Sequence, residues 1–440
     1  MAPTALSSET TRRPGYAQLL RTPRAWTFLI PGFLARQPFA MLTIGIVLLV
    51  EHTSGSYGTA GIVAAAAGLA VALIAPLCGK LADRYGQRAV LVPAVLVHAA
   101  AVSLLIVLAL SGAPLWALLL AAVLAGASVP QIGPMVRARW AARLDPRSPL
   151  QHTAAAFESV TDEFTFVVGP VLAAALCTGV HPAAGLVAEA VLTVTGGLLF
   201  AAQRRTQPQV SVRIAGASGA AGGSGGSALR ITGVRALAVA FLGIGMVFGG
   251  MQVSLTAFSE EIGNPGLNGV LYGVFAAGNM LAGLVVGLMH WRRPADRRLL
   301  VAYPVLVAAT VPLWIGASSP HAWLQGGLGL LVGICIAPAM ITGFTLVDSL
   351  VPAGARTEAY TWLTGAVALG QALASSAAGQ LADAGGARAG FLVPLGGTAL
   401  ACVVLVVLRR RLEPPAPPAP PVTGRIAARG ARHESPVAVD

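Results

Sequence analysis

Long apolar runs dominate this 440-residue chain and limit what it can fold into. Hydrophobic residues make up 55% of the chain and charged residues only 10%, whereas soluble domains average about 25% charged residues. A helix needs about 20 mostly apolar residues to cross a bilayer. Twelve segments qualify: 25–50, 58–78, 89–111, 114–136, 150–178, 182–202, 236–258, 267–289, 299–317, 322–348, 357–381 and 388–408. The sequence therefore predicts an all-α membrane protein with twelve transmembrane helices in a lipid bilayer.

The basic residues fall on one side of this predicted topology. If the N-terminus faces the cytoplasm, 27 of the 29 Lys and Arg residues lie in the inner segments and tails. The exceptions are Arg36, inside the first span, and Arg388, at the outer end of the last one. The positive-inside rule predicts this bias, so topology explains the net charge of +12 without a nucleic-acid partner. Heavy use of Ala, Gly and Arg suggests a bacterial protein, so we expect an inner-membrane location with both termini cytoplasmic.

The longest inner segment, 203–235, divides the spans into six and six. It contains a Gly/Ser-rich stretch typical of a flexible linker. The chain is thus predicted to begin with a cytoplasmic tail (1–24) and a six-helix half (25–202). The linker (203–235), a second six-helix half (236–408) and a disordered Pro-rich cytoplasmic tail (409–440) follow. A faint similarity between the runs that begin at Gly169 and Gly370 suggests that the halves are repeats.

The most informative polar stretch is the short loop at 79–88, between the second and third spans. It reads Gly-Lys-Leu-Ala-Asp-Arg-Tyr-Gly-Gln-Arg. Gly79 and Gly86 allow sharp turns and the close approach of a neighbouring helix. Asp83 places an acid where helix N-termini face the cytoplasm, among them the start of the span near Thr357, and acids are favoured there.

This loop resembles the signature loop of the major facilitator superfamily, and together with the span count it makes the chain similar to a secondary transporter. The resemblance implies two six-helix halves. It also implies that Asp83, Arg84 and Arg88 form a gate that locks the halves together on the cytoplasmic side. Either Arg137 or Arg139 is then the expected partner of Asp83. The alternative is a charged turn that only fixes the topology.

Ionisable residues inside spans are costly and point to a function or to an internal partner. Arg36 lies about ten residues into the first span, and three acids lie at similar depth in the fifth: Glu158, Asp162 and Glu163. We expect Arg36 to pair with Glu158 or Asp162, which leaves another acid free to carry a proton. A fixed ion cluster that never titrates is an equal alternative.

Gly169-Pro170 in the fifth span resembles part of the antiporter motif of drug exporters, and its proline predicts a hinge. Two features depart from that pattern: Ala173 and Ala174 replace the usual glycines, and the fourth span lacks a central Arg. By resemblance, spans 1, 4, 7 and 10 line a central cavity. They offer six candidate substrate contacts in apolar surroundings, which favour lipophilic molecules: Gln37, Gln131, Met246, Gln252, Met340 and Thr342.

The predicted function is proton-coupled export of a small lipophilic molecule by alternating access, carried out by a monomer. An importer or an uncoupled facilitator of the same fold is the alternative. The four Cys are scattered, the seven His are dispersed, and no HExxH or GxSxG pattern occurs. We therefore expect no metal, no cofactor and no enzyme activity, and a membrane sensor would need a larger soluble domain.

Overall fold

The computed structural model describes residues 15–145, 148–208, 227–264, 266–289, 291 and 293–413. The start of the N-terminal tail, the Gly/Ser-rich part of the linker and the Pro-rich tail lie outside these residues. Within them, every regular element is helical. The α-helices are α1 (Tyr16–Leu20), α2 (Ala25–Ser54), α3 (Tyr57–Tyr85), α4 (Gln87–Leu110), α5 (Leu115–Ala127), α6 (Ile132–Arg143), α7 (Leu150–Gly179), α8 (Ala184–Ala202), α9 (Thr232–Glu261), α10 (Leu267–Leu288), α11 (Ala295–Gly316), α12 (Ala322–Leu350), α13 (Arg356–Gly390) and α14 (Leu392–Val407).

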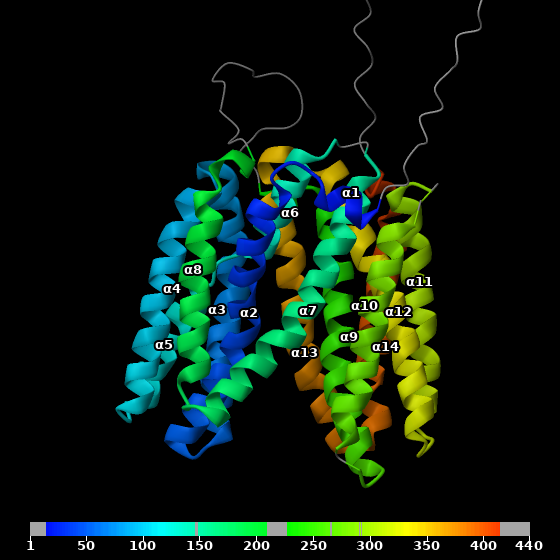
Figure 1. The fold of residues 1–440 in the computed structure, drawn as a ribbon. Coiled ribbons are helices and arrows are strands. Elements are labelled where there is room, and N and C mark those ends of the chain that lie inside the picture. Colours follow the sequence, from blue (N-terminus) through cyan, green and yellow to red (C-terminus); the bar gives the residue numbers. More distant parts are fainter. Residues whose placement is uncertain are drawn as a thin grey trace, which may run out of the picture.

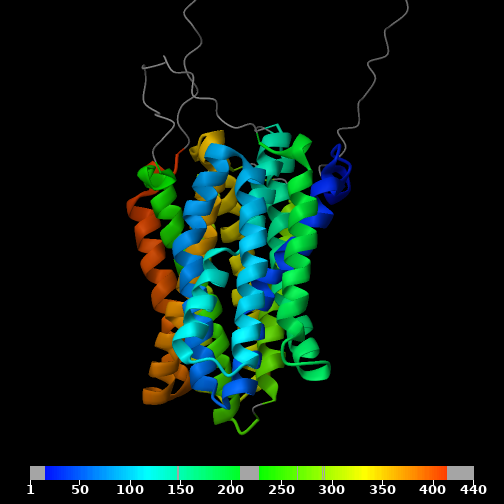
Figure 2. The same ribbon diagram turned by 90° about the vertical axis from the view of Figure 1, so that its left-hand side faces the viewer.

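The helices form two bundles that stand side by side in Figure 1, and Figure 2 views the molecule from the side of the first bundle. The first half contains α2 to α8 and the second contains α9 to α14. Each half has its own apolar core: Phe28, Val95 and Phe200 belong to the first, and Phe241, Phe275 and Phe391 to the second. The short helix α1 lies at one end of the molecule, which we call the α1 end (Figure 1).

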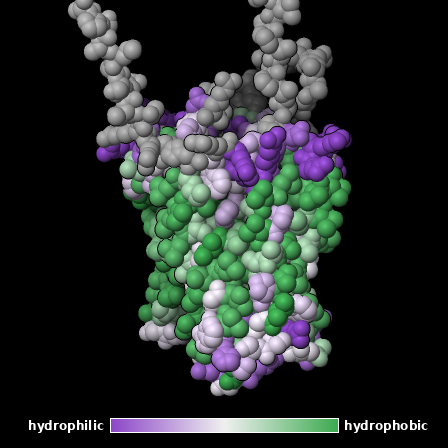
Figure 3. Space-filling model, turned by 90° about the vertical axis from the view of Figure 1, so that its right-hand side faces the viewer, coloured by the Kyte–Doolittle hydropathy of each residue, from purple (hydrophilic) through white to green (hydrophobic). Residues whose placement is uncertain are grey.

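The surface is apolar around the middle of the bundle, and polar side chains gather at the α1 end (Figure 3). Large apolar side chains such as Leu73, Trp116 and Val171 are more than half exposed. Such a belt fits contact with lipid tails, which form the hydrocarbon core of a bilayer, about 30 Å thick. The protein is therefore a multi-pass membrane protein.

Ten helices of the described residues are long and apolar enough to cross a membrane, with α5 and α6 counted together. The last two predicted spans fall on α13 and α14, which are bent by 76° relative to each other and add at most one span by the same criterion. Helix α14 has 16 residues, or about 24 Å at 1.5 Å per residue, which is shorter than the hydrocarbon core. The twelve-span count stays a prediction.

The fourth span, predicted to be continuous over 114–136, is broken in the structure. Helix α5 ends at Ala127 and α6 begins at Ile132. The break contains Pro130, which has no backbone N–H to donate. Within the same break, Gln131 Nε2 donates to the carbonyl oxygen of Val129 at 3.0 Å. The break places the N-terminus of α6 inside the bundle.

Candidate functional site

Asp83 joins the two halves at the α1 end. It lies in the last turn of α3, and its carboxylate accepts hydrogen bonds from the backbone N–H groups of Thr357, at 3.3 Å, and Glu358, at 2.9 Å. These N–H groups open α13, so they lack intrahelical acceptors and carry the positive end of the helix dipole. The predicted proximity of Asp83 to the helix start near Thr357 is present in the structure.

Two glycines of the 79–88 loop permit this contact. A Cβ atom at Gly79 would collide with the Thr361 hydroxyl and would lie 3.0 Å from the Thr357 carbonyl oxygen. Only a residue without a side chain lets α3 approach α13 this closely. Gly86 has a φ of +91°, in the region that favours glycine, and it forms the turn between α3 and α4.

The expected partners of Asp83 are wrong, because neither Arg137 nor Arg139 contacts it. Arg139 stays within the first half, where its guanidinium donates to the Gln87 side chain at 2.8 Å and to the Thr206 hydroxyl at 2.9 Å. Arg137 binds Asp162 instead. Residues two apart on a helix do not face the same side, so the two arginines of α6 serve different contacts.

Arg84 and Arg88, the other residues of the implied gate, are exposed. Among the described residues neither forms an ion pair, and the Arg84 guanidinium lies 5.2 Å from the ring centroid of its neighbour Tyr85. Of Asp83, Arg84 and Arg88, only Asp83 bridges the two halves in this conformation.

Further contacts close the α1 end beside Asp83. Arg356 of α13 donates to the carbonyl oxygen of Ala141 in the first half at 3.3 Å. The Arg137 guanidinium lies 4.0 Å above the ring of Phe344 in α12. A hollow of only about 10 Å³ remains between these elements, lined by residues of both halves that include Trp140 and Tyr360.

The opposite flank of the α1 end is closed by α1 and α7 against α10. The Tyr16 hydroxyl donates to the carbonyl oxygens of Gly283, at 3.2 Å, and Leu284, at 3.1 Å. The Thr153 hydroxyl donates to the carbonyl oxygen of Gly287 at 3.0 Å. Burial raises the pKa of Tyr16, which precedes the membrane-spanning helices, to about 12.

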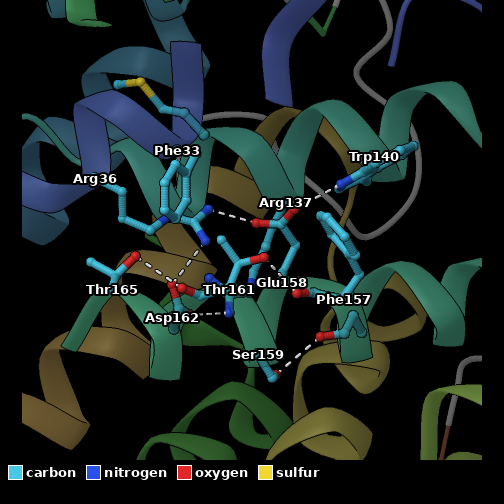
Figure 4. Close-up of polar contacts among 12 residues, drawn as sticks. Phe33, Arg36, Arg137, Trp140, Phe157, Glu158, Ser159, Thr161, Asp162 and Thr165 are labelled. Carbon is cyan, nitrogen blue, oxygen red and sulfur yellow. Dashed lines mark hydrogen bonds and ion pairs between the residues drawn. The ribbon is translucent and has the colours of Figure 1, made fainter. Parts of the chain in front are cut away.

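A buried cluster of four charged side chains lies deeper in the first half (Figure 4). Arg36 of α2 binds Glu158 at 2.5 Å and Asp162 at 3.0 Å, and Arg137 of α6 binds the other Asp162 oxygen at 2.5 Å. Trp140 Nε1 donates to the remaining Glu158 oxygen at 2.9 Å. Arg36 and Glu158 are 6% and 1% exposed, so each charge needs its partner. The expected Arg36 pairing is present and includes both acids.

Glu163 belongs to a different contact from its neighbour Asp162, since adjacent helical residues point to different sides. Its Oε1 accepts a hydrogen bond from Asn279 Nδ2 of α10 at 2.7 Å. Within the part of the chain that the structure describes, Glu163 has no cationic partner, and no hydrogen bond joins the halves farther from the α1 end. Asn279 was missed in the sequence, although an amide inside the apolar run 267–289 was a usable signal.

Gly169 is a packing position. A Cβ atom there would lie 2.8 Å from the Ala40 Cβ and 3.3 Å from the Gln37 carbonyl oxygen, so the glycine lets α7 cross α2 closely. Helix α7 continues through Pro170 to Gly179. The hinge role of Gly169 and Pro170 stays a prediction.

The six predicted substrate contacts line neither the hollow of about 10 Å³ beside Trp140 nor the hollow between α2 and α7. Helix packing buries or partly buries five of them: Gln37, Gln131, Met246, Met340 and Thr342. The sixth, Gln252, is exposed. The hollow between α2 and α7 has a volume of about 390 Å³ and is lined by other residues, including Trp26, Phe33, Arg36, Phe157 and Phe164. Contact of the six with substrate stays a prediction.

Comparison with known proteins agrees with this architecture. The sequence model of the Major Facilitator Superfamily matches residues 28–373 and 321–437. No curated protein matches the chain by sequence. Similar solved structures include the human organic anion transporter MFSD10 (TM-score 0.67, 16% identity, 89% of this chain and 100% of that chain). A second is a bacterial homologue of the iron transporter ferroportin in an outward-facing state (TM-score 0.70, 17% identity, 87% of this chain and 98% of that chain). A third is the Escherichia coli fucose:proton symporter (TM-score 0.65, 13% identity, 88% of this chain and 99% of that chain).

At identities this low, the structural similarity shows the fold alone. The family itself is shown by the sequence model, which matches most of the chain. The chain therefore belongs to the Major Facilitator Superfamily and is a transporter, not an enzyme.

Proposed function

We propose that this chain exports a small lipophilic molecule across a bacterial inner membrane, as a monomer, by alternating access coupled to proton entry. The proposal includes twelve spans, both termini in the cytoplasm and no metal or cofactor. The bias of Lys and Arg toward the inner segments supports this orientation. The α1 end is then the cytoplasmic end, and the closed contacts there correspond to an outward-facing state.

The observation that carries the proposal is the position of Glu163. It is an acid inside a membrane span, it touches the other half of the protein through Asn279, and among the described residues it has no cation. An acid of this kind can gain and lose a proton without breaking an ion pair. We assign proton transport to Glu163.

Glu158 and Asp162 are poorer candidates for the same role. Each carboxylate binds a guanidinium, and Asp162 binds two. Protonation of either acid would leave a buried Arg without its counter-ion, which is costly in a low dielectric. We propose that these four charges form the fixed cluster and that Glu163 is the acid left free.

The hollow between α2 and α7 supports a lipophilic substrate. Four aromatic side chains line it, and its volume of about 390 Å³ lies within the range of small-molecule sites. Proton coupling is compatible with the fold, because two similar structures are named as proton symporters, of fucose and of xylose. The partial Gly169-Pro170 motif supports export, and import remains the alternative.

Everted membrane vesicles test the direction and the coupling. Vesicles from cells that overproduce the protein would be given a panel of neutral lipophilic dyes, starting with Nile red, with and without an acidic interior. We expect at least one dye to accumulate only when the interior is acid, and not in vesicles that lack the protein. Accumulation that ignores the gradient would indicate a facilitator, and dye that leaves with the protons would indicate an importer.

A further inference from the structure

Only one of the two polar atoms of the Asn279 amide forms a hydrogen bond with Glu163. Its Nδ2 donates to Glu163 Oε1 at 2.7 Å. Its Oδ1 is buried and accepts no hydrogen bond from the described residues. A buried acceptor without a donor is destabilising, and Asn279 as a whole is only 2% exposed. An unpaired oxygen therefore lies in the same amide group that binds the free acid.

The missing donor is one that a protonated Glu163 would supply. A carboxylate only accepts hydrogen bonds, whereas a carboxylic acid has one O–H donor and keeps its acceptor oxygen. Ionised Glu163 uses the Nδ2 donor alone, as seen here. Protonated Glu163 would keep that bond and donate its O–H to Oδ1. The amide thus offers a partner to each protonation state.

The charged and titratable surroundings of Glu163 are few. On its own helix, Asp162 is the neighbouring charge, and Arg36 and Arg137 balance it. On α10, Tyr272 is the titratable group that interacts with Glu163 electrostatically. Asn279 is the group that donates a hydrogen bond to the acid, and it stands on the opposite half of the protein.

We propose that Asn279 is a positioning residue for the proton: it hydrogen-bonds Glu163 in both protonation states and makes proton exchange depend on the contact between α7 and α10. This inference rests on the proposed role of Glu163 and deepens it. When the halves part at the α1 end, α10 withdraws the amide from the acid. The proton affinity of Glu163 then differs between the two conformations, as coupling requires.

Infrared difference spectroscopy of the purified full chain tests this directly. The carboxylic acid band that disappears in Glu163→Gln reports protonation of Glu163, and its pH midpoint is the readout. Asn279→Leu removes one bond from ionised Glu163 and two from protonated Glu163, but a buried charge without a donor costs more than a buried neutral acid without partners. We therefore expect the acid to bind its proton about ten- to a hundredfold more tightly. The midpoint would move to higher pH by one to two units. Asn279→Ala gives the same shift if the leucine variant does not fold.

Gln325→Leu is the matched control. Gln325 is also a fully buried amide on the second half, with its Nε2 bonded, to the Leu313 carbonyl oxygen, and its Oε1 unpaired. Its loss should leave the midpoint unchanged. A midpoint that does not move in the Asn279 variants, or that moves equally in Gln325→Leu, overturns the role of Asn279. Absence of a titrating Glu163 band in the wild type overturns both this role and the proposed proton carrier.

Discussion

The Asp83 carboxylate lies 2.9 Å from the backbone nitrogen of Glu358, so the signature loop of the first half is bonded to the first turn of α13 in the second half. The carboxylate accepts hydrogen bonds from N–H groups of the other bundle and interacts favourably with the positive end of that helix dipole. Opening of the α1 end must break this contact, which makes the loop a latch between the halves.

Asp83→Asn should weaken the latch. The amide keeps an acceptor oxygen but loses the negative charge, which contributes about 0.3–1 kcal/mol at a helix N-terminus. This corresponds to a roughly twofold to fivefold shift toward the state open at the α1 end. Spin labels at Arg88 and Arg410, which are exposed on opposite halves, would report the opening in a variant without native cysteines. Arg84→Ala is the control, since Arg84 forms no ion pair with the second half among the described residues. Equal effects of the two substitutions would contradict the account.

Gly79→Ala should open the same end by a steric route. The added Cβ meets the Thr361 hydroxyl and the backbone of α13, so α3 and α13 must move apart. Gly68→Ala on the same helix meets nothing within 4 Å and should behave as wild type. The same pair of spin labels measures both variants. An unchanged distance distribution in Gly79→Ala would show that the close approach is not needed for closure.

Removing Arg36 should destabilise the protein more than removing a whole ion pair. Arg36→Leu leaves Glu158 buried without a counter-ion, at a cost of about 3–5 kcal/mol. The double variant Arg36→Leu with Glu158→Leu keeps the remaining Asp162–Arg137 pair, so it should recover part of that loss. Unfolding of the purified proteins in detergent would rank them: wild type, double variant, single variant. A single variant as stable as wild type would show that the cluster does not need its charge balance.

Glu163→Gln should separate transport from the proton gradient. The amide cannot release a proton, so a compound found in the vesicle assay should still exchange across the membrane but should no longer accumulate against its gradient. Glu260→Gln, at the exposed end of α9, is the control and should retain accumulation. Gradient-driven accumulation in Glu163→Gln would assign the proton to another group.

The sequence was sufficient for features that depend on depth and periodicity. Equal depth in two spans predicted that Arg36 meets the acids of α7, and the start of a span near Thr357 predicted the contact of Asp83. Features that depend on helix rotation were not accessible. Nothing in the spacing of Arg137 and Arg139 shows that one faces Asp162 and the other Gln87.

Two further features needed the fold itself. The apolar run 114–136 contains prolines, but only packing decides that the helix breaks before Ile132. Asn279 acquires its meaning from Glu163, which lies 116 residues away in the chain. Such a pair arises from the approach of two halves, and neither half alone indicates it.

Proton flux in pyranine-loaded proteoliposomes tests the central claim most directly. A neutral compound that everted vesicles accumulate would be added outside liposomes that contain the wild-type protein. The account predicts that the lumen becomes more alkaline as the compound enters, because protons leave in exchange, and that Glu163→Gln abolishes the pH change while exchange of the compound continues. A lumen that becomes acid, or that keeps its pH while the wild-type protein transports the compound, would contradict it.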